Sequence, residues 1–80
     1  MTARSLRNTL KVHRAKHDWT QEELARRVKV TRKTINTIEN GKYVPSTHLA
    51  LMIARAFGAT VEELFQLEDE ELAAVPKHAS

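Results

Sequence analysis

The stretch TQEELARRVKVTRKTINTIENGKYVPS, residues 20–46, decides the fold of this chain, because it contains the start and stop signals of two short helices. Thr20 opens a capping box, and the apolar residues behind it continue at helical spacing only as far as Lys29. Thr31 is the next N-cap residue, and the pair Asn40-Gly41 is a typical helix stop. The stretch therefore predicts two short helices that are joined by a tight turn.

Apolar residues recur at helical spacing on both sides of this stretch, and glycine and proline are scarce, with two of each. The further helices that we expect run from about Arg4 to His17, from Pro45-Ser46 to Gly58, and from a second capping box at Thr60 through Val61, Leu64 and Phe65. In the first of them, Leu6, Leu10 and Ala15 should face inward. No strand signal competes before residue 65. The sequence therefore predicts an all-α domain of five helices.

The domain is expected to cover residues 1–67, because a chain of 80 residues supports at most one small hydrophobic core. Residues 68–80 begin with four acidic residues and are expected to form an acidic tail. The run Phe65-Gln66-Leu67-Glu68 alternates in polarity, which predicts a short C-terminal strand within residues 65–70. A brief extra helix at Leu72 to Val75 is an alternative for the tail.

The net charge of +3 conceals an asymmetry between the two halves of the chain. Residues 1–43 contain 11 Lys and Arg against 4 Asp and Glu, whereas residues 44–80 contain 2 against 6. A concentrated positive charge favours a polyanionic partner, which for a small protein is usually nucleic acid. The alternative is a basic face that is merely solvated.

Several classes of protein are excluded by composition and spacing. The chain has no cysteine, so it lacks disulfides and thiolate metal ligands. Its longest apolar run, Leu49–Ala54, is too short for a membrane span or a signal peptide, and we expect a cytoplasmic location. His13 and His17 have a zinc-compatible spacing but lack further ligands, and no serine has His and Asp partners. We therefore expect no metal, no cofactor and no enzymatic activity.

The helix predicted over residues 31–39 carries the strongest functional signal. Its buried side is expected to be Ile35 and Ile38, which leaves a polar face that points outward on neighbouring turns: Arg32, Lys33, Asn36 and Thr37. An α-helix fits the major groove of DNA, where Arg or Lys can donate to guanine and Asn can pair with adenine. The alternative is that this face is only solvated.

Residues 20–46 resemble the helix-turn-helix of the XRE type, the family of the phage Cro and CI repressors. The run LALMIARAFGATVEELF, residues 49–65, is similar to the two helices that follow in that family, so the likeness covers about residues 6–67. It implies a five-helix, lambda-repressor-like DNA-binding domain. The implied function is sequence-specific binding of double-stranded DNA as a transcriptional repressor associated with the nucleoid.

The resemblance also implies roles for individual residues. Base contacts are expected from the outward face of the helix at residues 31–39, namely Arg32, Lys33, Asn36 and Thr37. Phosphate contacts are expected from helix starts and from the loop after that helix, namely Gln21, Thr31, Asn40, Lys42 and Tyr43. The free N–H groups and positive dipole of the helix that begins at Gln21 independently favour a phosphate there.

Two further positions matter for geometry rather than for direct contact. In similar proteins the arginine at the place of Arg14 pairs with the glutamate at the place of Glu39, and a phosphate contact by Arg14 is the alternative. Lys29 stands in a turn where many family members have glycine, because a left-handed backbone is needed there.

A single domain of this kind contacts one half-site, so we expect a homodimer and an inverted-repeat operator. Small XRE-type proteins of this kind dimerise through a short C-terminal strand, which implies an interface that contains Phe65 and Leu67. A loose tail or an unpaired edge strand is the alternative. The alternative function is that of an antitoxin or adaptor, which binds a partner protein through its acidic C-terminal surface.

Overall fold

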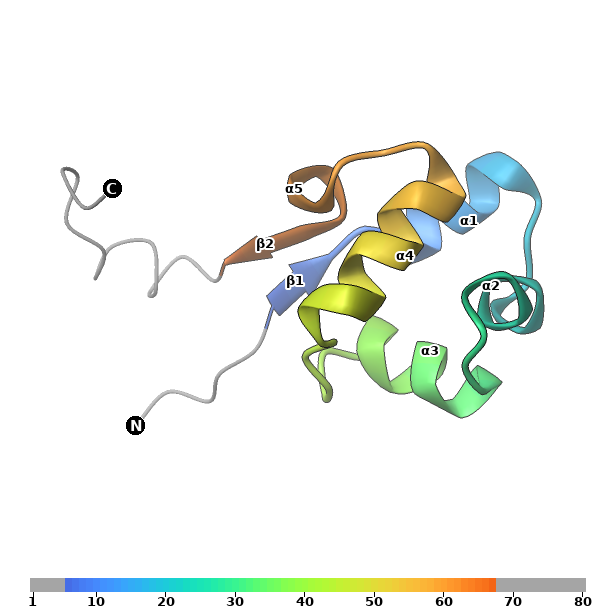
Figure 1. The fold of residues 1–80 in the computed structure, drawn as a ribbon, viewed down its shortest axis with the longest axis horizontal. Coiled ribbons are helices and arrows are strands. Elements are labelled where there is room, and N and C mark those ends of the chain that lie inside the picture. Colours follow the sequence, from blue (N-terminus) through green and yellow to red (C-terminus); the bar gives the residue numbers. More distant parts are fainter. Residues whose placement is uncertain (1–5, 68–80) are drawn as a thin grey trace, which may run out of the picture.

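The computed structural model describes residues 6–67. The elements in chain order are β1 (Leu6–Asn8), α1 (Leu10–His17), α2 (Gln21–Val28), α3 (Arg32–Glu39), α4 (Thr47–Phe57), α5 (Val61–Leu64) and β2 (Phe65–Leu67). Figure 1 shows α2 and α3 towards one end of the molecule and the strand pair towards the other. The predicted acidic tail, residues 68–80, and the end of the predicted strand lie outside the described residues.

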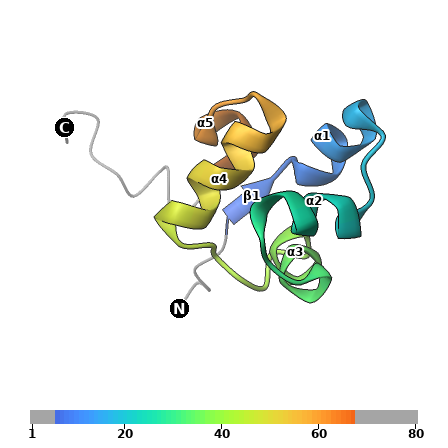
Figure 2. The same ribbon diagram turned by 45° about the vertical axis from the view of Figure 1, so that its right-hand side comes forward.

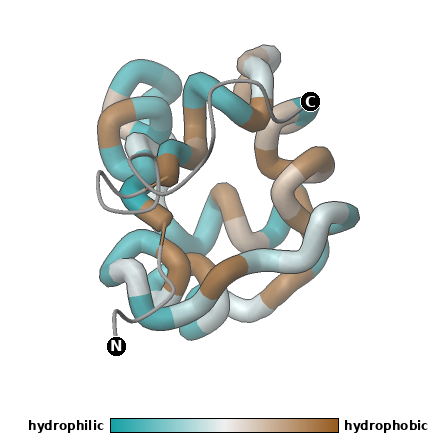
Figure 3. Tube along the Cα trace, turned by 90° about the vertical axis from the view of Figure 1, so that its left-hand side faces the viewer, coloured by the Kyte–Doolittle hydropathy of each residue, from teal (hydrophilic) through white to brown (hydrophobic). Residues whose placement is uncertain are grey.

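Every helix contributes to one hydrophobic core, and this confirms the expected five-helix fold. The largest fully buried side chains are Leu10, Leu24, Ile35, Ile38, Ile53 and Leu64. Figure 3 shows hydrophobic and hydrophilic positions alternating along the helices, as amphipathic segments require. Each such side chain contributes about 1.5 to 3 kcal/mol on burial, so apolar packing is the main source of stability.

The predicted starts of the last four helices are confirmed by their caps. The hydroxyl groups of Thr20, Thr31, Ser46 and Thr60 each accept the backbone N–H three residues further along, at 3.0 to 3.2 Å. These bonds satisfy donors that have no partner within the helix. They fix where each helix begins.

The two predicted capping boxes differ in completeness. The box at the start of α5 has both of its hydrogen bonds. At the start of α2 only one of the two predicted hydrogen bonds forms. The carboxylate of Glu23 does not accept the N–H of Thr20 but accepts from Arg26 and, at 2.7 Å, from Arg27. Two guanidinium groups on the following turn are stronger donors than one backbone N–H. The hydrogen bond from Arg26 is the main cause that lowers the pKa of Glu23.

The first predicted helix is too long at its N-terminal end. Residues 6–8 form β1, which pairs antiparallel with β2 so that Leu6 lies opposite Leu67. The expectation that no strand precedes residue 65 is therefore wrong. Leu6 packs against the core from a strand, and Ala15 is exposed rather than inward.

Asn8 explains why the helix starts late. Its side-chain oxygen accepts the N–H of Leu10 at 3.3 Å, and its Nδ2 donates to the carbonyl of Ile38 at 2.9 Å. Such local side-chain bonds offer the backbone an alternative to the helix. Thr9 adds to this, since its N–H donates to the carbonyl of Leu64 at 2.9 Å. The bonds to Ile38 and Leu64 come from distant parts of the chain, so helical periodicity does not reveal them.

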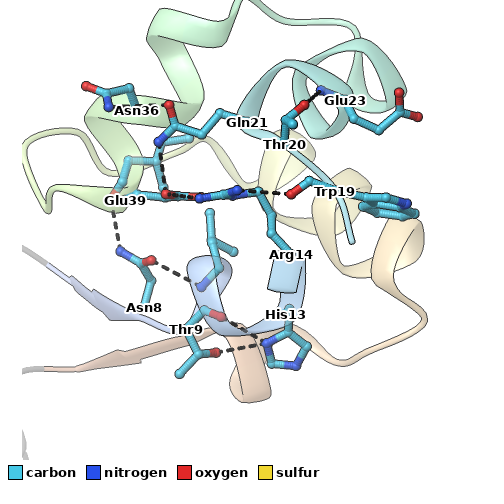
Figure 4. A network of polar contacts seen from close by, with 12 residues as sticks. Asn8, Thr9, His13, Arg14, Trp19, Thr20, Gln21, Glu23, Asn36 and Glu39 are labelled. Carbon is cyan, nitrogen blue, oxygen red and sulfur yellow. Dashed lines mark hydrogen bonds and ion pairs between the residues drawn. The ribbon is translucent and has the colours of Figure 1, made fainter. Parts of the chain in front are cut away.

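An ion pair joins α1 to the end of α3. Arg14 Nε donates to Glu39 Oε2 at 2.7 Å and Arg14 Nη2 donates to Glu39 Oε1 at 3.0 Å, while Nη1 donates to the carbonyl of Trp19 at 3.0 Å (Figure 4). The two side chains are 15% and 8% exposed. The hydrogen bond to Glu39 raises the pKa of Arg14 above its ordinary value. The pair therefore fixes α3 against α1 by two parallel charged hydrogen bonds.

Replacing Arg14 with Met should lower the free energy of unfolding by about 3 kcal/mol, because the carboxylate of Glu39 then stays largely buried without its charged partner. The double variant Arg14→Met, Glu39→Leu removes that charge and should regain most of the loss. Urea denaturation of both variants and the wild type measures the difference. A single variant as stable as the double variant would contradict this account.

Candidate nucleic-acid interface

The helix α3 is anchored by one face and exposed on the other. Ile35 and Ile38 are 0% and 1% exposed, whereas Arg32 and Lys33 in the first turn are exposed. Within residues 6–67 neither of these two cations has a side-chain hydrogen bond or ion pair. Both are therefore available to an external acceptor.

The turn before α3 sets the direction in which that face points. Lys29 has φ 61° and ψ 44°, so it adopts the left-handed conformation that the sequence predicted for this position. Its N–H donates to the carbonyl of Arg26 at 3.3 Å, and the N–H of Val30 donates to that of Ala25 at 3.0 Å. These bonds close α2 and allow α3 to start after only three residues. Figure 2 shows α2 and α3 side by side at one edge of the molecule.

Thr37 lies on the outward side of α3 but has its hydroxyl occupied. Its Oγ1 donates to the carbonyls of Lys33 and Thr34, at 3.0 and 2.9 Å. The single hydroxyl proton is therefore used within the helix. Thr37 keeps a methyl group and an acceptor lone pair, which suit contact with a thymine methyl or a base amino group.

Several of the predicted contact residues line one shallow hollow of about 240 Å³ beside α3. Its lining is Thr31, Lys33, Thr34, Thr37 and Tyr43. Thr34 was not predicted as a site residue, although its spacing of three from Thr31 and Thr37 places all three on one side of the helix. The hollow brings the expected base contacts of α3 next to an expected phosphate contact of the loop.

The loop after α3 is held to the helix by its backbone. Asn40 is the C-cap residue, Gly41 has φ 73°, and the N–H of Lys42 donates to the carbonyl of Thr37 at 3.0 Å. The side chains of Asn40, Lys42 and Tyr43 are exposed. The loop therefore presents its polar groups next to the end of α3.

Gln21 and Asn36 are not free side chains but members of a hydrogen-bonded chain, which we call the amide chain. Gln21 Nε2 donates to Glu39 Oε1 at 3.0 Å, Asn36 Nδ2 donates to Gln21 Oε1 at 3.4 Å, and Asn40 Nδ2 donates to Asn36 Oδ1 at 3.2 Å. Figure 4 shows Gln21 between Glu39 and Asn36. The sequence indicated these residues singly and did not predict that they are connected.

Arg14 lies at the inner end of this arrangement. Three of its nitrogen atoms donate within the protein, and its side chain is only 15% exposed. Little of the guanidinium group remains for a phosphate. The geometry favours the ion pair with Glu39 over the alternative role.

The two residues expected at a dimer interface differ in accessibility. Phe65 is 8% exposed and belongs to the core, whereas Leu67 is 41% exposed. Phe65 also lines an apolar hollow of about 350 Å³, whose other lining residues are Leu6, Pro45, Thr47, Ala50, Leu51 and Val61. Leu67 is therefore the residue of the pair that is more accessible to a second chain.

The two histidines considered for zinc pack against aromatic rings. The ring centroids of His13 and His17 lie 5.5 and 5.3 Å from that of Phe57, and His17 lies 4.6 Å from Trp19. Among residues 6–67 no three His, Cys, Asp or Glu side chains are grouped as metal ligands. None of the helices in this range is long and apolar enough to cross a bilayer.

Comparison with known proteins identifies relatives over most of the chain. The model of a helix-turn-helix family matches residues 10–64. An uncharacterized HTH-type transcriptional regulator of Methanocaldococcus jannaschii is 50% identical over 66 residues, which are 82% of this chain and 100% of the relative. Another, of Archaeoglobus fulgidus, is 52% identical over 67 residues, 84% of this chain and 96% of the relative.

Solved structures show the same fold. The clp gene regulator ClgR of Corynebacterium glutamicum has a TM-score of 0.63 and 30% identity over 68% of this chain and 57% of its own. The SOS-response transcriptional repressor LexA of Eubacterium rectale has a TM-score of 0.66 and 25% identity over 89% of this chain and 76% of its own. The chain therefore belongs to the XRE-type helix-turn-helix family, which consists of DNA-binding transcriptional regulators and not of enzymes.

Proposed function

We propose that this protein is a sequence-specific transcriptional repressor that binds an inverted-repeat operator as a homodimer and inserts α3 into the major groove. The observation that carries the proposal is the division of α3 into a buried apolar side and an exposed polar side. Ile35 and Ile38 hold the helix on the core. Arg32 and Lys33 project from the opposite side without partners among residues 6–67. Groups of this kind donate to guanine in the major groove.

The charge around α3 supports contact with DNA. Glu39 is the one acidic residue of α3, and its carboxylate is paired with Arg14. Arg32, Lys33 and Lys42 therefore remain as uncompensated cations on this side of the molecule. Such an arrangement attracts the phosphate backbone and holds the helix in register.

Phosphate contacts would flank the base contacts on both sides. The N-terminus of α2 presents free N–H groups next to Gln21, and the exposed Thr31 lies at the start of α3. The loop with Asn40, Lys42 and Tyr43 follows the other end of α3. Contacts from both ends of α3 would fix its orientation in the groove.

A homodimer would place two copies of α3 about 34 Å apart, one turn of B-DNA. Among residues 6–67 β2 pairs only with β1, so its other edge would be available to a strand from a second chain. Leu67 is exposed next to this edge, and the apolar hollow beside Leu6 and Phe65 would be covered as well. A dimer of this kind would occupy a promoter and exclude other proteins.

The repressor role has support from the similarity to LexA, which is a transcriptional repressor. The protein would act in the cytoplasm, on the DNA of the nucleoid. The alternative role as an antitoxin or adaptor has only the acidic composition of residues 44–80 in its favour, and four of the six acids lie outside the described residues. The exposed cations of α3 therefore favour DNA binding.

Replacing Arg32 with Ala should weaken binding to the cognate operator by about 1 to 3 kcal/mol and relax the preference at one base pair. The operator is first selected from random duplexes with the wild type, and affinities are then titrated. Arg55→Ala changes an exposed arginine on α4 and serves as the matched control. Equal affinities for the Arg32 variant and the control would remove Arg32 from the base contacts.

Replacing Lys42 with Ala should weaken binding to all sequences alike and reduce the slope of log affinity against log salt by about 1, because one phosphate contact is lost. Titrations at several salt concentrations measure the slope. Lys11→Ala, at an exposed position of α1, should leave it unchanged. An unchanged slope for the Lys42 variant would exclude that contact.

Replacing Leu67 with Glu should convert the dimer into monomers, because a charge would then be buried between the two chains. Sedimentation velocity measures the change. Val12 is also exposed, at 53%, and Val12→Glu on α1 should leave the dimer intact. Persistent dimers of the Leu67 variant would place the interface elsewhere.

A further inference from the structure

The amide chain connects the largely buried ion pair of Arg14 and Glu39 with Asn36, a proposed base contact. We propose that Glu39 and Gln21 are positioning residues that determine specificity, because they fix the direction in which the amide of Asn36 faces a base pair. The inference rests on the proposed function and adds to it two residues that need not touch a base themselves.

The direction of the amide chain is set at its inner end. The carboxylate of Glu39 has only acceptor atoms, and Arg14 donates to both oxygens. Gln21 can therefore bind Glu39 only through its NH₂ group, which turns its carbonyl oxygen towards α3. The side chain of Glu39 is 8% exposed, so water offers little competition for this position.

The orientation of the Gln21 amide in turn determines the orientation of the Asn36 amide. Gln21 presents an oxygen, so Asn36 meets it with its NH₂ group, and Asn40 then donates to the oxygen of Asn36. Asn36 therefore holds its donor towards the start of α2 and its acceptor towards the end of α3. One N–H and one lone pair of its amide remain for an external partner.

An amide group with a fixed orientation forms both of its hydrogen bonds with only one of the two orientations of a base pair. Base edges in the major groove present ordered rows of donors and acceptors, and exchange of the two bases between the strands reverses each row. A fixed amide matches an acceptor followed by a donor, as at N7 and N6 of adenine, and leaves polar groups unpaired against the reverse order. An asparagine that could turn over would still donate to O4 of thymine in the exchanged pair, where the thymine methyl takes the place of N7, so the exchange would cost it less.

The test compares two orientations of a single base pair. Selection from random duplexes with the wild type gives the operator, and Asn36→Ala identifies the base pair that depends on Asn36. Affinity is then titrated on this operator and on a duplex in which that pair is exchanged between the strands. The wild type should prefer the selected orientation by about 5-fold to 150-fold, the range of one bidentate contact.

Two variants change the amide chain at different places. Gln21→Leu interrupts the chain and leaves the ion pair of Arg14 and Glu39 intact. The amide of Asn36 can then turn to O4 of thymine in the exchanged pair, so the preference should fall by about 2-fold to 12-fold, the contribution of one hydrogen bond. In Glu39→Gln the new NH₂ group meets an N–H of Arg14 in either orientation, because Arg14 donates to both positions, so the direction of the chain is no longer fixed. The preference should then fall as it does in Gln21→Leu. Glu62→Gln is the same chemical change at an exposed position of α5 and should keep the wild-type preference.

The results separate the inference from the function on which it rests. A Gln21→Leu variant that keeps the orientation preference would overturn the inference alone, even if its affinity falls for all sequences alike through loss of the phosphate contact expected at the start of α2. An Asn36→Ala variant with unchanged preference at every base pair would overturn it as well. If the wild type enriches no sequence, the proposed function fails, and the inference fails with it. If Glu39→Gln does not fold, the orientation preference of Gln21→Leu alone tests the inference.

Discussion

The ion pair between Arg14 and Glu39 is the interaction on which the geometry of the interface depends. Apolar contacts of Ile35 and Ile38 hold α3 on the core, but hydrophobic burial is non-directional and does not by itself fix the rotation of a short helix. Two parallel charged hydrogen bonds at the last residue of α3 do fix it. The outward residues of α3 consequently share one direction.

The same pair determines the electrostatics of this surface. It compensates the single acidic charge of α3, and Glu23 on α2 is compensated in the same way by Arg26 and Arg27. Glu39 and Glu23 are thus paired with arginines, whereas Arg32 and Lys33 have no such partner among residues 6–67. A modest net charge of +3 can therefore produce a surface that attracts a polyanion.

The strand pair brings the two ends of the described chain together. A two-stranded sheet is marginal by itself, and this one is supported because Leu6 and Phe65 pack on the helical core. The pairing also brings Asn8 within reach of the carbonyl of Ile38, so the start of the domain contacts the end of α3. The helices and the sheet thus stabilise each other.

The sequence by itself determined where four of the five helices begin and which side of α3 is apolar. Caps such as Thr31 and Ser46 and the positions of Ile35 and Ile38 depend on neighbours a few residues away, so local patterns predict them. Tertiary structure alone decided that residues 6–8 form a strand, because their partner lies almost sixty positions away. It also decided the order of donors and acceptors along the amide chain, because that order follows from contacts between three helices that no local pattern records.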